Sequence, residues 1–137
     1  MPVPKKLKKI KIEGKIDHNT KRTLCRVDDV DDMDELIELT KNDNPHIRLK
    51  ALQRMCPCHN TENITKFWDR MFEMVDDEEL GIRKQVLHNL CDGSPSEYEV
   101  QVMNAVLDLS RDKDKDLRRM CNKIMASYRA TGEWNIM

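Results

Sequence analysis

The 137-residue sequence has no apolar run long enough to cross a membrane, and its Lys-rich beginning is not followed by the apolar stretch of a secretory signal. The net charge is only −1, so the overall charge balance indicates no class of partner. Five cysteines, an odd number, point to reduced thiols rather than to a disulfide framework. We therefore expect a cytoplasmic protein that does not enter a membrane.

Motifs for several kinds of catalysis are also missing. The chain contains no phosphate-binding loop, dinucleotide fingerprint or metalloprotease motif. A cysteine nucleophile needs an adjacent base and a group that orients the base. His59 directly follows Cys58, but no third member and no oxyanion site accompany them. The sequence therefore predicts a protein that is not an enzyme and that carries no cofactor.

What the chain does contain is a 35-residue repeat in three copies. Asn44–Arg48, Glu79–Arg83 and Asp114–Arg118 align, with the Arg recurring in step. Apolar residues recur in columns before each of these segments: Met33/Trp68/Met103, Leu36/Met71/Val106, Ile37/Phe72/Leu107 and Leu39/Met74/Leu109. A unit of this length buries its apolar face only by stacking on its neighbours. The repeat thus predicts a stacked architecture.

Each copy divides into two amphipathic helical segments, because its apolar residues follow helical spacing. Pro45 suits the start of a helix, and Gly132 suits the end of the last one. We predict a single domain over 17–137 with three helical hairpins at about 31–56, 62–91 and 97–130. Residues 17–30 are expected to form a short N-terminal capping helix, and Trp134 to fold back over the other end. Residues 1–16 are predicted to be a basic, flexible tail.

The periodic unit resembles the short-loop form of the HEAT repeat. The resemblance is carried by the segments Asp77–Arg83 and Asp112–Arg118 and, more loosely, by Asn42–Arg48, and it covers about residues 31–130. It implies an all-α, right-handed solenoid of three HEAT-like hairpins, in the wider armadillo-like class, with short caps. It also implies a structural ladder of acidic residues and arginines between adjacent copies: Asp77, Asp112, Arg48, Arg83 and Arg118.

Charge follows the same period. The predicted second helices, taken as 45–56, 80–91 and 117–128, contain eight basic residues and no acidic one, whereas the first helices and turns carry an acidic excess. The resemblance places second helices on the concave face, which implies a basic concave surface. The residues expected to bind there are Lys50, Arg54, Lys84, His88, Arg119 and Lys123. The alternative is that the ladder arginines are engaged internally and the other basic residues only solvate their helices.

Two functions compete for this surface. The first is a non-catalytic scaffold that binds a protein partner, with an acidic segment favoured because a face of one charge attracts the opposite charge. The alternative is a nucleic-acid-binding protein that uses the same basic face. Six lysines in the first 15 residues are typical of a solvated tail, with a nucleic-acid arm or a localisation signal as the alternative. The sequence predicts neither the partner nor the oligomeric state.

One compact group of metal-binding residue types stands at 56–59. Thiolates and imidazoles are zinc ligands, and the candidates are Cys56, Cys58, His59 and Cys91. However, the Cys-x-Cys spacing is tighter than the usual two-residue spacing, and Cys56 and Cys91 also fit the buried end of an apolar helix face. The sequence therefore favours a structural role for these cysteines, and no metal is predicted.

Overall fold

The computed structural model describes residues 10–56 and 64–134, and regular structure in these segments is entirely helical, which confirms the predicted all-α class. The α-helices in these segments are α1 (His18–Asp28), α2 (Met33–Leu39), α3 (Pro45–Arg54), α4 (Thr65–Glu73), α5 (Leu80–Cys91), α6 (Glu99–Leu109) and α7 (Lys115–Thr131). Two short 3₁₀ helices, η1 (Met74–Asp76) and η2 (Ser96–Tyr98), extend α4 and precede α6. None of the described helices is both long enough and apolar enough to cross a membrane.

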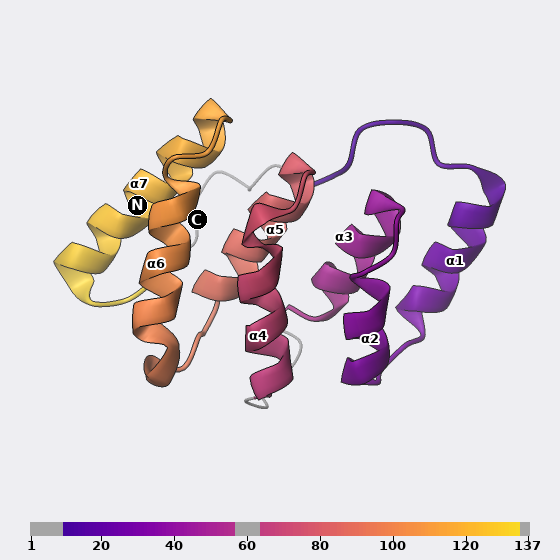
Figure 1. Ribbon diagram of the computed structural model, residues 1–137, viewed down its shortest axis with the longest axis horizontal. Coiled ribbons are helices and arrows are strands. Elements are labelled where there is room, and N and C mark those ends of the chain that lie inside the picture. Colours follow the sequence, from indigo (N-terminus) through magenta and orange to yellow (C-terminus); the bar gives the residue numbers. More distant parts are fainter. Residues whose placement is uncertain (1–9, 57–63, 135–137) are drawn as a thin grey trace, which may run out of the picture.

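The helices are arranged in two rows (Figure 1). In one row α4 packs against α2 and α6, and in the other α3 packs against α1 and α5. The rows are joined where α2 packs on α3, α4 and α6 pack on α5, and α6 packs on α7. The helix pairs α2–α3 and α4–α5 fall within the first two predicted hairpins, and α6–α7 matches the third except that α7 ends at Thr131, one residue beyond it.

Local sequence sets the ends of the helices. The Asn44 side chain accepts a hydrogen bond of 2.9 Å from the backbone N–H of His46, and Pro45 begins α3. In α7 the Asp114 side chain accepts from the Leu117 N–H at 2.8 Å. Gly132 ends α7 with a φ of 75°, in the left-handed region that favours glycine, as the sequence predicted.

Burial follows the columns of the repeat. Leu36, Met71 and Val106 are all buried, and so are the equivalent residues that precede each repeated Arg, Ile47, Ile82 and Leu117. The third copy departs from this pattern at one column. Leu52 and Leu87 are each 0% exposed, whereas Asn122, their equivalent, is exposed. The polar residue thus stands on α7, the last helix of the described residues.

Both ends of the helical array carry extra elements. At one end α1 packs against α3 and contributes the buried Val27 to the core. At the other end the ring of Trp134 stacks on Tyr128 with centroids 4.1 Å apart, and Trp134 packs against the edge of the core. These are the places where the sequence led us to expect a capping helix and a folded-back terminal segment.

The N-terminal segment corrects one expectation. Residues 1–9 lie outside the described residues, but 10–12 pack against the helices instead of extending as part of a flexible tail. Ile12 is 8% exposed and belongs to the core, and the Ile10 carbonyl accepts a hydrogen bond of 3.5 Å from Gln53 Nε2. A Cβ added at Gly81 would lie 2.7 Å from the Lys11 carbonyl oxygen and 2.8 Å from Ile12 Cδ1. The missing side chain of Gly81 is therefore what lets this segment approach α5.

We expect the Gly81→Ala substitution to displace the N-terminal segment. The new methyl group would meet the backbone of Lys11, which cannot move without lifting Ile12. Exposing Ile12 costs about 1.5–3 kcal/mol, and alanine returns at most about 1 kcal/mol over glycine in a helix. The free energy of unfolding should fall by about 1 kcal/mol, and amide hydrogen exchange over 10–14 should accelerate.

The control is the same substitution in an Ile12→Ala background. When Ile12 is already truncated, displacing the N-terminal segment exposes less apolar surface. The effect of Gly81→Ala on the free energy of unfolding should then become neutral or stabilising. A Gly81→Ala protein that is more stable than the wild type, with unchanged exchange over 10–14, would contradict this account.

Candidate functional site

The repeated arginines link neighbouring copies through carboxylates. Arg48 Nη2 donates to Asp77 Oδ1 at 3.2 Å, and the side chains of both residues are nearly buried. Arg83 binds Asp112 through two parallel bonds, Nε to Oδ1 at 2.8 Å and Nη2 to Oδ2 at 3.2 Å. Such bidentate pairing fixes orientation as well as adding energy. These four residues thus lie where the resemblance places the ladder.

Arg118 marks the end of that series. Its Nη1 donates to the Asp112 carbonyl at 2.7 Å, just as Arg48 and Arg83 each donate to backbone carbonyls of the turn before their own helix. Within the described residues, however, Arg118 has no carboxylate partner. The repeated Arg therefore makes two separate kinds of contact. It donates hydrogen bonds to backbone carbonyls of the turn before its own helix, and in the first two copies it also binds a carboxylate of the next copy.

The ladder shapes the titration of Asp112. Burial of the carboxyl raises its pKa, but this effect is outweighed by the backbone N–H of Asp114 and by the hydrogen bonds and charge of Arg83. The pKa of Asp112 therefore lies below its ordinary value, and the carboxylate stays charged in the folded protein.

The basic residues of α3 are not a free surface. Lys50 Nζ lies 2.8 Å from Asp28 Oδ1 at the end of α1. Arg54 Nη2 donates to the Val30 carbonyl at 2.9 Å and to Asp31 Oδ1 at 3.1 Å. Both cations thus have partners within the chain, Lys50 at the last residue of α1 and Arg54 in the connection from α1 to α2. Their assignment to the binding face stays a prediction.

The remaining four predicted residues fall into two columns of the repeat. Lys84 on α5 is equivalent to Arg119 on α7, and His88 is equivalent to Lys123. Arg119 and Lys123 are exposed, and Lys84 and His88 are half-buried. Lys84, Arg119 and Lys123 pair with no carboxylate among the residues that the structure describes. We call these four residues the basic columns.

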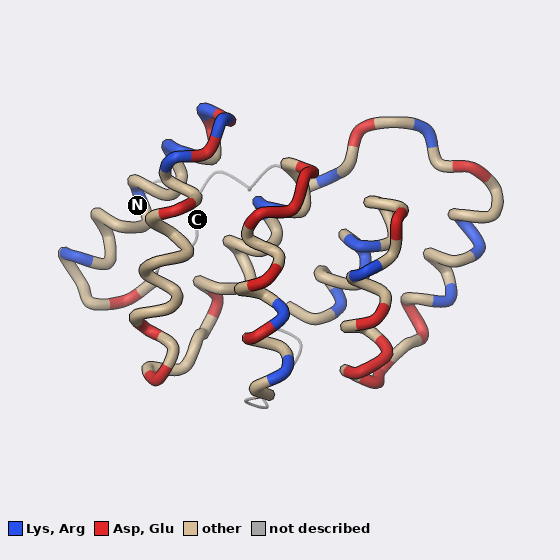
Figure 2. Tube along the Cα trace, in the orientation of Figure 1, with Lys and Arg blue, Asp and Glu red and all other residues tan. Residues whose placement is uncertain are grey.

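Figure 2 shows how the charges are distributed: the turn between η1 and α5 is acidic, and α3 and α5 carry basic residues without acidic ones. The pattern is less strict in the third copy. Helix α7 begins at Lys115, two residues before the predicted start, and so includes Asp116 in its first turn. An acidic residue there is favourable because it faces the positive end of the helix dipole. The strictly basic pattern of the second helices therefore holds for α3 and α5 only.

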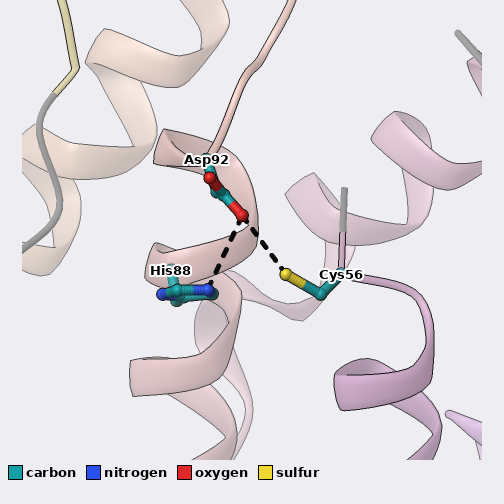
Figure 3. Close-up of side chains that lie close together, drawn as sticks. All are labelled: Cys56, His88 and Asp92. Carbon is teal, nitrogen blue, oxygen red and sulfur yellow. Dashed lines mark hydrogen bonds and ion pairs between the residues drawn. The ribbon is translucent and has the colours of Figure 1, made fainter. Parts of the chain in front are cut away.

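A second candidate site lies where the ends of α3 and α5 meet (Figure 3). Cys56 follows α3, His88 lies in the last turn of α5, and Asp92 is the next residue after α5. Asp92 Oδ2 lies 3.4 Å from Cys56 Sγ and 3.8 Å from His88 Nε2. One ligand atom from each residue lies within 4.8 Å of the other two. A thiol, an imidazole and a carboxylate thus converge from two neighbouring copies.

The other cysteine candidates are placed differently. Burial raises the pKa of the Cys91 thiol to about 12, with a further contribution from Cys121. Burial also raises the pKa of Cys121 to about 12, and the charge of Asp112 adds to this. Because the thiolate is the form that binds metals and attacks substrates, these two protonated thiols are suited to packing. Cys58 and His59 lie outside the described residues.

Sequence reasoning found two members of the cluster but not the third. It placed Cys56 among the metal candidates and His88 on the basic face, and it gave Asp92 no role. The sequence held a signal, because Asp92 follows His88 by four residues, a spacing that brings two side chains close at the end of a helix. What joins them to Cys56 is the packing of α3 on α5.

Comparisons with protein-family models, with curated proteins and with solved structures gave no match.

Proposed function

We propose that the chain is a HEAT-like, right-handed α-solenoid that serves as a non-catalytic scaffold for a protein partner inside the cell. The partner is expected to present an acidic segment to the basic columns. The two rows of helices and the repeated Arg–Asp contacts support the solenoid. The buried thiols of Cys91 and Cys121 suit a compartment in which cysteines stay reduced.

The observation that carries the proposal is the availability of the basic columns. Of the six residues predicted to bind, Lys50 and Arg54 are neutralised within the chain. Lys84, Arg119 and Lys123 keep their charge unmatched by any carboxylate in the described segments. Unpaired like charges at equivalent repeat positions make a surface that attracts an oppositely charged segment.

A polyanion offers the same charge as an acidic peptide, so nucleic acid is the alternative partner. Lys and Arg bind phosphates, and affinity for a single strand would fall steeply with salt, with a slope of about −0.7 per phosphate neutralised. The protein partner is favoured because the basic columns contain no Phe, Tyr or Trp on which bases would stack. Direct comparison of the two ligands decides between them.

The test uses the triple variant Lys84→Glu, Arg119→Glu and Lys123→Glu. Its binding to a fluorescent oligo-glutamate peptide should weaken at least about tenfold, because attraction becomes repulsion. The wild type should also capture proteins from a cell extract that the triple variant does not, and nuclease treatment should not release them. Fluorescence anisotropy and affinity capture supply these measurements.

A matched control reverses three exposed basic residues on α1: Lys21, Arg22 and Arg26. It changes the net charge by the same amount on another surface and should bind like the wild type. If the triple variant and the wild type capture the same proteins, the basic columns are not the binding surface. If nuclease releases the captured material and a single-stranded oligonucleotide binds with the expected salt slope, the alternative holds.

A further inference from the structure

Cys56 and Asp92 take no part in the proposed scaffold, and together with His88 of the basic columns they form a cluster of distinct chemistry. The three residues come from the ends of two helices that pack side by side, so their backbones are held by the core. Cys56 is 3% exposed, while the side chains of His88 and Asp92 are 30% and 38% exposed. The group is thus fixed on its protein side and open on the other.

The spacing of the ligand atoms fits a tetrahedral ion. With zinc bonds of about 2.3 Å to sulfur and about 2.0–2.2 Å to nitrogen and oxygen, the sulfur and oxygen ligands stand about 3.6 Å apart, and nitrogen and oxygen about 3.4 Å apart. The observed distances are 3.4 Å for Cys56 Sγ to Asp92 Oδ2 and 3.8 Å for His88 Nε2 to the same oxygen. For these two pairs, closing on an ion requires shifts of only a few tenths of an ångström, and the sulfur and imidazole nitrogen lie within 4.8 Å of each other.

The arrangement is unfavourable for a cysteine nucleophile. In a nucleophilic triad the imidazole stands between the nucleophile and the carboxylate. Here the carboxylate of Asp92 contacts both the thiol and the imidazole, as the two dashed lines in Figure 3 show. The same three groups that make a poor catalyst make a good ligand set.

We propose that Cys56, His88 and Asp92 bind a single divalent transition-metal ion of borderline softness, Zn²⁺ being the clearest case. Sulfur, imidazole nitrogen and carboxylate oxygen are the donors that Zn²⁺ takes in proteins. On binding, the proton of the Cys56 thiol passes to solvent and the sulfur coordinates as thiolate. Within the described residues three protein ligands converge, and water can take the fourth position on the side where His88 and Asp92 are exposed.

The test measures metal binding by the full chain. After treatment with a chelator, the wild type should bind one Zn²⁺ in competition with a chromogenic chelator. Co²⁺ should give the intense visible bands of a tetrahedral site and a sulfur-to-cobalt charge-transfer band. Cys56→Ser, His88→Gln and Asp92→Asn should each weaken Zn²⁺ binding by at least about 100-fold, more than the loss of an outer-shell partner, which is about 10- to 100-fold.

Residue-matched controls separate this site from other thiols and imidazoles. Cys25→Ser, His46→Gln and the double variant Cys58→Ser, His59→Gln should leave the affinity and the cobalt spectrum unchanged. His88 and Asp92 are partly exposed, so their variants test the site without opening the core, and circular dichroism checks that each still folds. Absence of stoichiometric binding by the wild type, or binding that survives His88→Gln and Asp92→Asn, would overturn the proposal.

Discussion

Replacing Arg83 by Met is expected to lower the free energy of unfolding by about 3–5 kcal/mol. The guanidinium holds both oxygens of Asp112, and the two side chains are only 7% and 10% exposed. Its removal leaves a nearly buried carboxylate that has lost its partner, and this uncompensated charge is the main cost. Urea unfolding followed by circular dichroism measures the loss.

The chain supplies a matched control at the next copy. Arg118 donates to the same kind of backbone carbonyl but binds no carboxylate among the described residues. Arg118→Met should therefore cost only about 0.5–1.5 kcal/mol, the contribution of one hydrogen bond. Adding Asp112→Asn to Arg83→Met should recover part of the stability, because the amide keeps an oxygen for the Asp114 N–H and carries no charge. Equal losses for Arg83→Met and Arg118→Met would contradict the ladder.

The pH dependence of this pair has a definite sign. Because the pKa of Asp112 is lower in the folded chain, the unfolded chain binds a proton more readily. The stabilisation is complete above the ordinary carboxyl pKa of about 3.9 and is lost as the pH falls through the lower pKa of the folded state. The wild type and Asp112→Asn should accordingly approach equal stability in acid. A stability difference that grows as the pH falls would contradict the assignment.

Truncating Leu87 to Ala is the second substitution with a large expected effect. Leu87 is 0% exposed within α5, so the change removes apolar contacts and leaves a cavity. Such substitutions cost about 2–5 kcal/mol, depending on how far the surroundings relax. The midpoint of urea unfolding should fall while its slope stays unchanged, because the surface exposed on unfolding is similar.

The repeat again provides the control. Asn122 occupies the equivalent position in α7 and is exposed, so Asn122→Ala should change stability by no more than about 0.5 kcal/mol. Leu52→Ala, at the equivalent position of α3, should behave like Leu87→Ala because Leu52 is also 0% exposed. A large loss for Asn122→Ala would contradict the exposed position of this residue in α7.

The helices and their buried columns could be predicted because one period governs them. Each copy places apolar residues at the same helical positions, so Leu36, Met71 and Val106 are buried for the same reason. Helix ends were equally readable where the chemistry is local, as at Pro45 and Gly132. The arrangement of the copies in two rows then follows from stacking.

The candidate sites were less predictable because they depend on residues outside the period. Lys50 resembles a free cation in sequence, and only the position of α1 shows that Asp28 neutralises it. Asp92 looks like a turn residue until the packing of α3 on α5 brings Cys56 to it. The packing of Ile12 is signalled in the sequence only by Gly81, a glycine in the first turn of α5, where a helix does not need one. Contacts between distant segments of a chain seldom produce a local sequence signal of this kind.

That docking also has a consequence for the order in which the protein forms. Synthesis proceeds from the N-terminus, and α1 to α3 can begin to pack as they leave the ribosome. Ile12 cannot reach its buried place until Gly81 has emerged, because the surface that receives it is on α5. The residues around Ile12 are thus synthesised first among those described but reach their native position late, and until then Ile12 is exposed on the nascent chain.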